Sequence, residues 1–333
     1  MIDRTAQDVR PDKPREHMHW RFDTQEDCPA AEGWKITRRD WLMASGVVAA
    51  ALSVEMPVAW GAQTNGQSHL RFGIVTDAHY ADAPARGTRQ YRSSLPKMAE
   101  CVALMNDVKV DFLIHLGDFK DQSTPALEED TLKYLETIET VFGQFTGPRY
   151  HVLGNHDMDS ISKEQFLARV ENTAIPPAHK HFSFDCMGVH FVVLDANYTS
   201  DGADYDHGNF DWTDANVPQG QLDWIRKDLA SASGPVIGFV HQQLDGGGSH
   251  CVKNADEVRH ILQECRRVLA VFQGHNHAGD YSRIENIHYY TLKAMVEGNS
   301  DEDNAYAIVD VRQDGHIVVS GYRKAVGREL GTA

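Results

Sequence analysis

Cysteine is scarce in this chain. Five cysteines occur among 333 residues, and no two of them stand at the close spacing of a zinc knot or a redox motif. This scatter argues against a disulfide framework and against a cysteine-ligated zinc site. A single bridge between Cys251 and Cys265 is conceivable in an oxidising compartment, but the pattern favours buried free thiols.

Basic residues are also few. Lys and Arg total 32 against 48 Asp and Glu, which gives a formal net charge of −16. No stripe of Lys and Arg is present to follow a nucleic-acid backbone, and an acidic surface would repel one. The composition therefore predicts no nucleic-acid partner.

Long hydrophobic runs are missing as well. An apolar stretch near the start, Leu42 to Val54, is too short to span a bilayer comfortably. It follows the pair Arg38-Arg39, and this combination resembles a twin-arginine export signal. Small residues around Gly61 fit cleavage after that position, and a buried N-terminal helix is the alternative interpretation.

The leader sets the expected domain boundaries. Residues 1–61 are interpreted as a signal that engages the twin-arginine export machinery, and residues 62–333 as a single catalytic domain. Export by this route predicts a periplasmic protein, and we expect no stable membrane insertion of the mature chain.

What the chain does contain is a series of five polar clusters, each of which follows a short apolar run. They are Asp77-Ala78-His79, Gly117-Asp118, Gly154-Asn155-His156-Asp157, His241 and Gly274-His275-Asn276-His277. Carboxylate, amide and imidazole ligands suit Mn, Fe, Zn or Co. One ion does not need so many ligands, so the set predicts two divalent metal ions that share a bridging ligand. Such pairs activate water against phosphate esters.

Alternation of strand-like and helix-like segments predicts the framework that carries these clusters. Apolar runs at 70–76, 111–116 and 150–153 alternate with amphipathic patterns at 90–108 and 126–142, which favours parallel strands covered by helices. Further strands are expected at 181–185, 190–195, 236–240, 268–273, 287–292, 306–311 and 316–322, and further helices at 219–230 and 255–265. In such sheets, substrates and cofactors bind just beyond the carboxyl ends of the strands. The five polar clusters lie at those ends.

The ordered motifs, D-x-H, G-D, G-N-H-D, a lone His and G-H-x-H, resemble those of the calcineurin-like metallophosphoesterases across roughly residues 70 to 323. The resemblance implies an α/β fold, a four-layer α-β-β-α sandwich. It also implies a first metal held by Asp77, His79 and His277, a second held by Asn155, His241 and His275, and Asp118 bridging the two together with a nucleophilic hydroxide. His156 would protonate the leaving oxygen, and Asp157 would orient its ring.

The substrate is less well defined by the residues. Tyr91-Arg92-Ser93-Ser94-Leu95 and Val296-Glu297-Gly298 resemble the manganese-dependent ADP-ribose/CDP-alcohol diphosphatases, but His79 departs from the glutamine of that group. A small phosphodiester or nucleoside-diphosphate-type substrate is therefore expected. Phosphomonoesterase, cyclic-nucleotide phosphodiesterase and a catalytically degenerate binding protein are the alternatives.

Several other residues could border such a site. The long polar stretch from Ala196 to Asn216 is a candidate wall, and the glycine-rich segment from Asp245 to His250 is a candidate lid. Tyr80 and Arg92 could touch substrate, although packing is the simpler role for Arg92. The strand histidines outside the motifs are expected to be packed or surface residues: His115, His151, His181 and His190.

Overall fold

The computed structural model describes residues 68–331. The predicted leader, its cleavage point and its export route lie outside the described residues. No helix within the described part of the chain combines the length and apolar character needed to cross a membrane.

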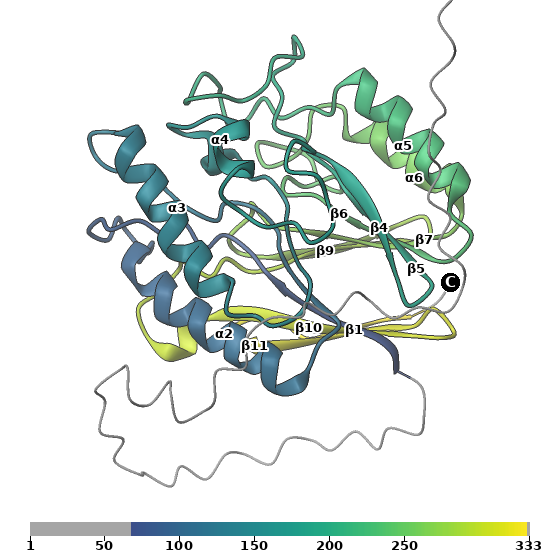
Figure 1. Ribbon diagram of the computed structural model, residues 1–333. Coiled ribbons are helices and arrows are strands. Elements are labelled where there is room, and N and C mark those ends of the chain that lie inside the picture. Colours follow the sequence, from purple (N-terminus) through teal and green to yellow (C-terminus); the bar gives the residue numbers. More distant parts are fainter. Residues whose placement is uncertain (1–67, 332–333) are drawn as a thin grey trace, which may run out of the picture.

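Two six-stranded mixed sheets form the centre of the fold, and Figure 1 shows them stacked between two pairs of helices. The first sheet has the spatial order β12 (Arg328–Leu330), β11 (Ile317–Arg323), β10 (Ala305–Arg312), β1 (Ser68–Val75), β2 (Phe112–His115), β3 (Arg149–His151). The second has the order β4 (Phe182–Cys186), β5 (Val189–Val193), β6 (Val236–Phe239), β7 (Val268–Gln273), β9 (Ile287–Thr291), β8 (Asp280–Ile284).

Helices cover the outer face of each sheet. The first sheet is covered by α2 (Ser94–Val108) and α3 (Glu128–Phe142), and the second by α5 (Gln219–Ser231) and α6 (Ala255–Cys265). A short α4 (Lys163–Leu167) and three 3₁₀ turns lie in the connections: η1 (Tyr91–Ser93), η2 (Asn155–Met158) and η3 (Asp301–Asp303).

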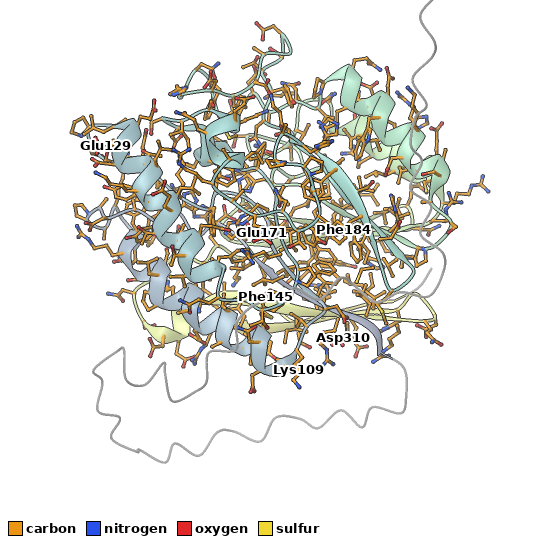
Figure 2. The ribbon with its side chains drawn as sticks, viewed as in Figure 1. Lys109, Glu129, Phe145, Glu171, Phe184 and Asp310 are labelled. Atoms are coloured by element: carbon orange, nitrogen blue, oxygen red, sulfur yellow. The ribbon has the colours of Figure 1, made fainter. Side chains whose placement is uncertain are left out.

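Three apolar layers hold the sandwich together. Between the sheets, the ring of Phe72 on β1 packs edge-on against Phe191, Phe239 and Phe272 of the second sheet, with centroids 5.6–5.8 Å apart. Figure 2 labels Phe184 among the side chains of this central layer, and Glu129 at the outer end of α3. A second cluster lies between the first sheet and its helices, and a third lies between the second sheet and its helices. The predicted four-layer α-β-β-α sandwich is confirmed.

The expected helices and all of the expected strands are present, with ends shifted by a few residues. The sequence patterns missed β8, whose residues are mostly half-exposed, the three-residue strand β12 and the short α4. A capping box begins α4, because the Ser162 side chain accepts a hydrogen bond from the Gln165 backbone and the Gln165 side chain accepts one from Ser162 N. The S-x-x-Q spacing was a readable signal for this helix.

Parallel pairing brings the polar clusters to one edge of the sandwich. Strands β1, β2 and β3 run parallel, as do β5, β6, β7 and β9, so their carboxyl ends meet there. Backbone bonds then link the two sheets directly: Met295 N donates to Thr76 O at 3.0 Å, and Val296 N donates to Asp77 O at 3.0 Å. These hydrogen bonds hold the loop that carries the first motif against the loop that follows β9.

Candidate metal centre

Six of the predicted ligands gather into two groups, each with its ligand atoms within 4.8 Å of one another. One group is Asp77, His79 and His277, and the other is Asp118, His241 and His275. In the first, the Nε2 atoms of His79 and His277 are 3.1 Å apart, and they lie 3.7 and 3.5 Å from Asp77 Oδ1. This partition matches the one implied by the motif resemblance.

Asp118 lies between the two groups. Its Oδ2 atom is 3.1 Å from His241 Nε2 and 3.5 Å from His79 Nε2, so one oxygen faces both ligand sets. Its Oδ1 atom accepts a hydrogen bond of 2.8 Å from the backbone N–H of His156. The hydrogen bond to Oδ1 holds the carboxylate in place, and Oδ2 faces both ligand groups. A ligand that bridges two metal ions requires this arrangement.

Several ligand atoms are buried and have no hydrogen-bond partner within residues 68–331. They are Asp77 Oδ1, Asn155 Oδ1, His241 Nε2 and His275 Nε2. Leaving buried polar atoms unpaired costs about 1–3 kcal/mol each, and natural folds rarely do so without a reason. Cations bound at the two groups would satisfy all four, and the mixed N and O donor set fits a borderline divalent metal. The residues therefore fit the predicted metal centre, and Asn155 joins it from η2.

Second hydrogen bonds on the imidazoles aim their Nε2 atoms at the centre. His241 Nδ1 donates to Leu116 O at 2.8 Å, and His277 Nδ1 is 2.6 Å from Glu297 Oε1. His79 Nδ1 lies 3.3 Å from Asp121 Oδ2. Such outer partners fix the ring orientation of a metal-binding histidine. Asp121 was not predicted, although its position three residues after Asp118 in the same loop was a usable signal.

The backbone at the site is strained. Asp77, His79, Asp118 and His275 have φ values of 51°, 45°, 56° and 67°, a left-handed region that non-glycine residues seldom occupy. Strain of this kind persists where surrounding contacts over-determine it, typically at functional sites. Gly154 is required for a related reason, because a Cβ there would collide with the backbone nitrogen of Asp118.

The charges are arranged for cation binding. Burial raises the pKa of Asp77, but the imidazoles of His277 and His79 beside it hold that pKa well below its ordinary value. Burial lowers the pKa of His275 to about 3, so this ring is neutral. Burial lowers the pKa of His241, yet Asp118 outweighs this and raises it to about 9. A metal must displace that proton, so metal binding releases protons here.

His156 belongs to neither of these two ligand groups, but it forms a third group of close ligand atoms with His79 and Asp121. Its ring centroid is 4.7 Å from that of His79, and its side chain is 27% exposed, which leaves room for a substrate. Burial lowers its pKa, but Asp159 and Asp118 raise the pKa to about 10. The ring is thus a cation able to donate a proton.

The prediction that Asp157 orients His156 is wrong. Asp157 is buried and accepts backbone N–H bonds from Gly154, Phe119 and Asp118 at 2.8, 2.8 and 3.1 Å, which ties the second and third motif loops together. The η2 turn points Asp157 back into the protein. Asp159, one turn after His156, instead lies 2.7 Å from His156 Nδ1.

The remaining histidines and cysteines behave as the sequence predicted. His115 and His151 are buried among rings, and His181 packs on Trp224. Cys101, Cys251 and Cys265 are free thiols, and the first two are buried.

The predicted border residues divide into two sets. Arg92 pairs with Asp82 on the surface, and Tyr80 is mostly buried. The two loops predicted as wall and lid do reach the centre, because the rings of Trp212 and His250 lie 5.5 and 5.3 Å from His275. Neither of these two rings was predicted.

Comparisons with known proteins agree with this geometry. Residues 70–279 match the family model described as calcineurin-like phosphoesterase. The chain is 28% identical, over 79% of its length and 97% of the relative, to a manganese-dependent ADP-ribose/CDP-alcohol diphosphatase of Oryza sativa subsp. japonica. It is 21% identical, over 61% of its length and 70% of the relative, to a probable cyclic nucleotide phosphodiesterase of Psychrobacter arcticus.

A solved structure shows the same fold. A dimetal phosphatase from Danio rerio superimposes with a TM-score of 0.69 at 18% identity, over 80% of this chain and all of that one. The family match spans more than half of the chain and includes all five motifs. The chain therefore belongs to the calcineurin-like phosphoesterase family and is a metal-dependent phosphoric ester hydrolase.

Proposed function

We propose that this protein hydrolyses a small phosphodiester or nucleoside-diphosphate-type substrate with two divalent metal ions. The observation that carries the proposal is the position of Asp118 Oδ2, which faces His79 Nε2 and His241 Nε2 at 3.5 and 3.1 Å. A single-ion site would not need a carboxylate between two ligand groups. When bound, such a pair of cations activates water as the nucleophile and neutralises charge on the phosphoryl group.

The residues of the chain supply the remaining parts of the reaction. Asp77, His79 and His277 would hold one ion, Asn155, His241 and His275 the other, and Asp118 both. His156 Nδ1 is engaged by Asp159, so Nε2 is the atom that would donate a proton to the departing oxygen. Mn, Fe and Zn all suit this donor set. Manganese is favoured because it is named for the diphosphatase relative.

A hydrolysis screen of the purified protein with added Mn²⁺ tests the substrate class. It would include bis-p-nitrophenyl phosphate, p-nitrophenyl phosphate, ADP-ribose, CDP-alcohols and cyclic AMP. Turnover of diester or diphosphate substrates well above that of the monoester supports the proposal. Preferential monoester hydrolysis would contradict it, and no turnover at all would favour a binding protein.

Metal stoichiometry tests the bridged pair separately. Elemental analysis should give close to two ions per active wild-type chain and one or fewer for Asp118→Asn. Asp223→Asn is the matched control, because Asp223 lies exposed on α5 and pairs with Arg226. A fully active wild-type protein with a single ion would contradict the bridge.

We also propose export to the periplasm through the twin-arginine machinery, which the pair Arg38-Arg39 before an apolar run supports. Replacing both arginines with lysine should retain the protein in the cytoplasm. Unchanged periplasmic yield of that variant would contradict this route.

A further inference from the structure

Trp212 borders the metal centre, yet the proposed chemistry does not use it. Its side chain is 41% exposed, and its ring centroid is 5.5 Å from both His250 and His275. His275 belongs to the second ligand group. A large aromatic surface therefore adjoins the metal centre and is still open to solvent, although burial is the usual state of so large an apolar ring.

His250 extends this aromatic surface from a separate loop. Its centroid lies 5.3 Å from His275, and its backbone oxygen accepts a 3.0 Å hydrogen bond from Gln243 N. The start of the same loop is fixed too, because Asp245 accepts hydrogen bonds from Gln273 Nε2 at 2.9 Å and from the Ser282 hydroxyl at 2.6 Å. Trp212 and His250 thus form a wall that is held at its base.

A cavity of about 500 Å³ is lined by chain neighbours of these two rings. Its lining includes Thr213 and the segment 246–249, which are the immediate chain neighbours of Trp212 and His250. Lys253 adds positive charge to this lining, whereas Arg259 and Asp256, which also line the cavity, form an ion pair with each other. Small-molecule sites typically enclose about 300–1,000 Å³, so the volume suits a nucleoside-sized group.

We propose that Trp212 and His250 form a stacking site for the planar base of a nucleotide ester. The phosphorus of that ester lies at the two ligand groups, and its ribose, which joins the base to the phosphate, lies between those groups and the wall. This inference rests on the proposed function and narrows it to substrates that carry a nucleobase. Aromatic stacking tolerates different bases because every base has a π-face, so the wall selects for a base without selecting which one.

The test compares two competitive inhibitors of bis-p-nitrophenyl phosphate hydrolysis by the full chain with Mn²⁺, AMP and inorganic phosphate. In the wild-type protein AMP should inhibit at least about 10-fold more tightly than phosphate, the advantage expected of one stacked base. Trp212→Ala should remove most of that advantage, and Trp212→Phe should keep most of it. His250→Ala should act in the same direction as Trp212→Ala.

Because both inhibitors are measured against the same substrate in each variant, the ratio of their inhibition constants is independent of any change in turnover. Leu127→Ala is the control, since Leu127 is another exposed large apolar residue and lies just before α3. Its ratio should equal that of the wild type. Equal inhibition by AMP and phosphate in the wild type, or an unchanged ratio in Trp212→Ala, would overturn the stacking site. Failure of the wild type to hydrolyse any phosphoester would contradict the proposed function instead.

Discussion

The Nδ1 atom of His156 lies 2.7 Å from Oδ2 of Asp159, at one turn's separation along η2. Asp121 Oδ2 approaches the same nitrogen at 3.8 Å, so the ring is flanked by two carboxylates on one side. This leaves Nε2 as the free nitrogen of His156 and favours the protonated ring. The relationship supports the proposal that His156 donates a proton and that Asp159 positions its ring.

Replacing His156 with Gln should slow turnover while both metals and the fold remain. General acid catalysis contributes about 10²–10⁴-fold, and the loss should be largest for alkyl diesters, whose leaving groups need protonation. For p-nitrophenolate esters the loss should be small, because that anion departs without a proton. Steady-state kinetics across a series of leaving groups measures this. A uniform loss would mean that His156 stabilises the phosphoryl group instead.

Replacing Asp159 with Asn should reproduce the His156 defect in weaker form, about 10-fold on kcat with alkyl substrates, because the ring loses its orienting carboxylate. The basic limb of the pH profile should move to lower pH at the same time. Asp159→Glu should restore part of the activity. Asp157→Asn is the comparison, and it should mainly lower stability, since its carboxylate binds backbone N–H groups. A leaving-group effect only in Asp157→Asn would contradict this assignment.

The sequence predicted the candidate ligands of this centre but not the residues that hold those ligands in position. The metal-binding side chains follow apolar strands in a fixed order, so their residue types and positions could be read directly. Asp159 contacts His156 only because the η2 turn brings the two side chains together. Glu297 contacts His277 only because a loop distant in sequence folds back to it. Trp212 reaches His275 across an irregular loop, and no periodicity describes such a path. The same reason explains the error at Asp157, whose direction depends on the turn and not on its neighbour in sequence.

Lys163 fastens the loop that carries Trp212. Its Nζ atom is fully buried and contacts Asp195 Oδ2 at 2.6 Å, Asp204 Oδ1 at 2.7 Å and Asn197 O at 2.7 Å. Removing one partner of a buried ion pair costs about 3–5 kcal/mol, because the other charge is left unpaired. Lys163→Met should lower the free energy of unfolding by about that amount in urea denaturation and expose residues 196–216 to protease.

Lys180 offers a matched control for this experiment. It also pairs with Asp204, at 2.8 Å, but its side chain is partly exposed. Solvent-screened pairs of this kind contribute about 0–1 kcal/mol, so Lys180→Met should change stability by less than about 1 kcal/mol. Similar losses in the two variants would show that burial of Lys163 is not what stabilises the loop.

His190 gives a pH-dependent stability that is independent of the metal centre. It lies on β5, with Nδ1 2.8 Å from Asp185 Oδ1 and Nε2 2.8 Å from Asp228 Oδ2. Burial lowers its pKa, but the two carboxylates outweigh burial and raise the pKa to about 9. Since the folded-state pKa exceeds the unfolded value of about 6.5, the stabilisation is complete below pH 6.5 and is lost as pH rises through 9.

His190→Gln should therefore destabilise the protein at pH 6 and have little effect near pH 10. Because the Asp185 side chain is 78% exposed, solvent screening reduces the expected loss at pH 6 to about 1–2 kcal/mol. Urea denaturation of the wild type and of His190→Gln at both pH values measures the difference in their free energies of unfolding. The metal-site histidines are the same in both proteins, so their contributions cancel in this difference. Asp228→Asn should show the same trend, because it removes the more buried of the two carboxylates. Equal destabilisation at both pH values would mean that His190 acts through packing rather than charge.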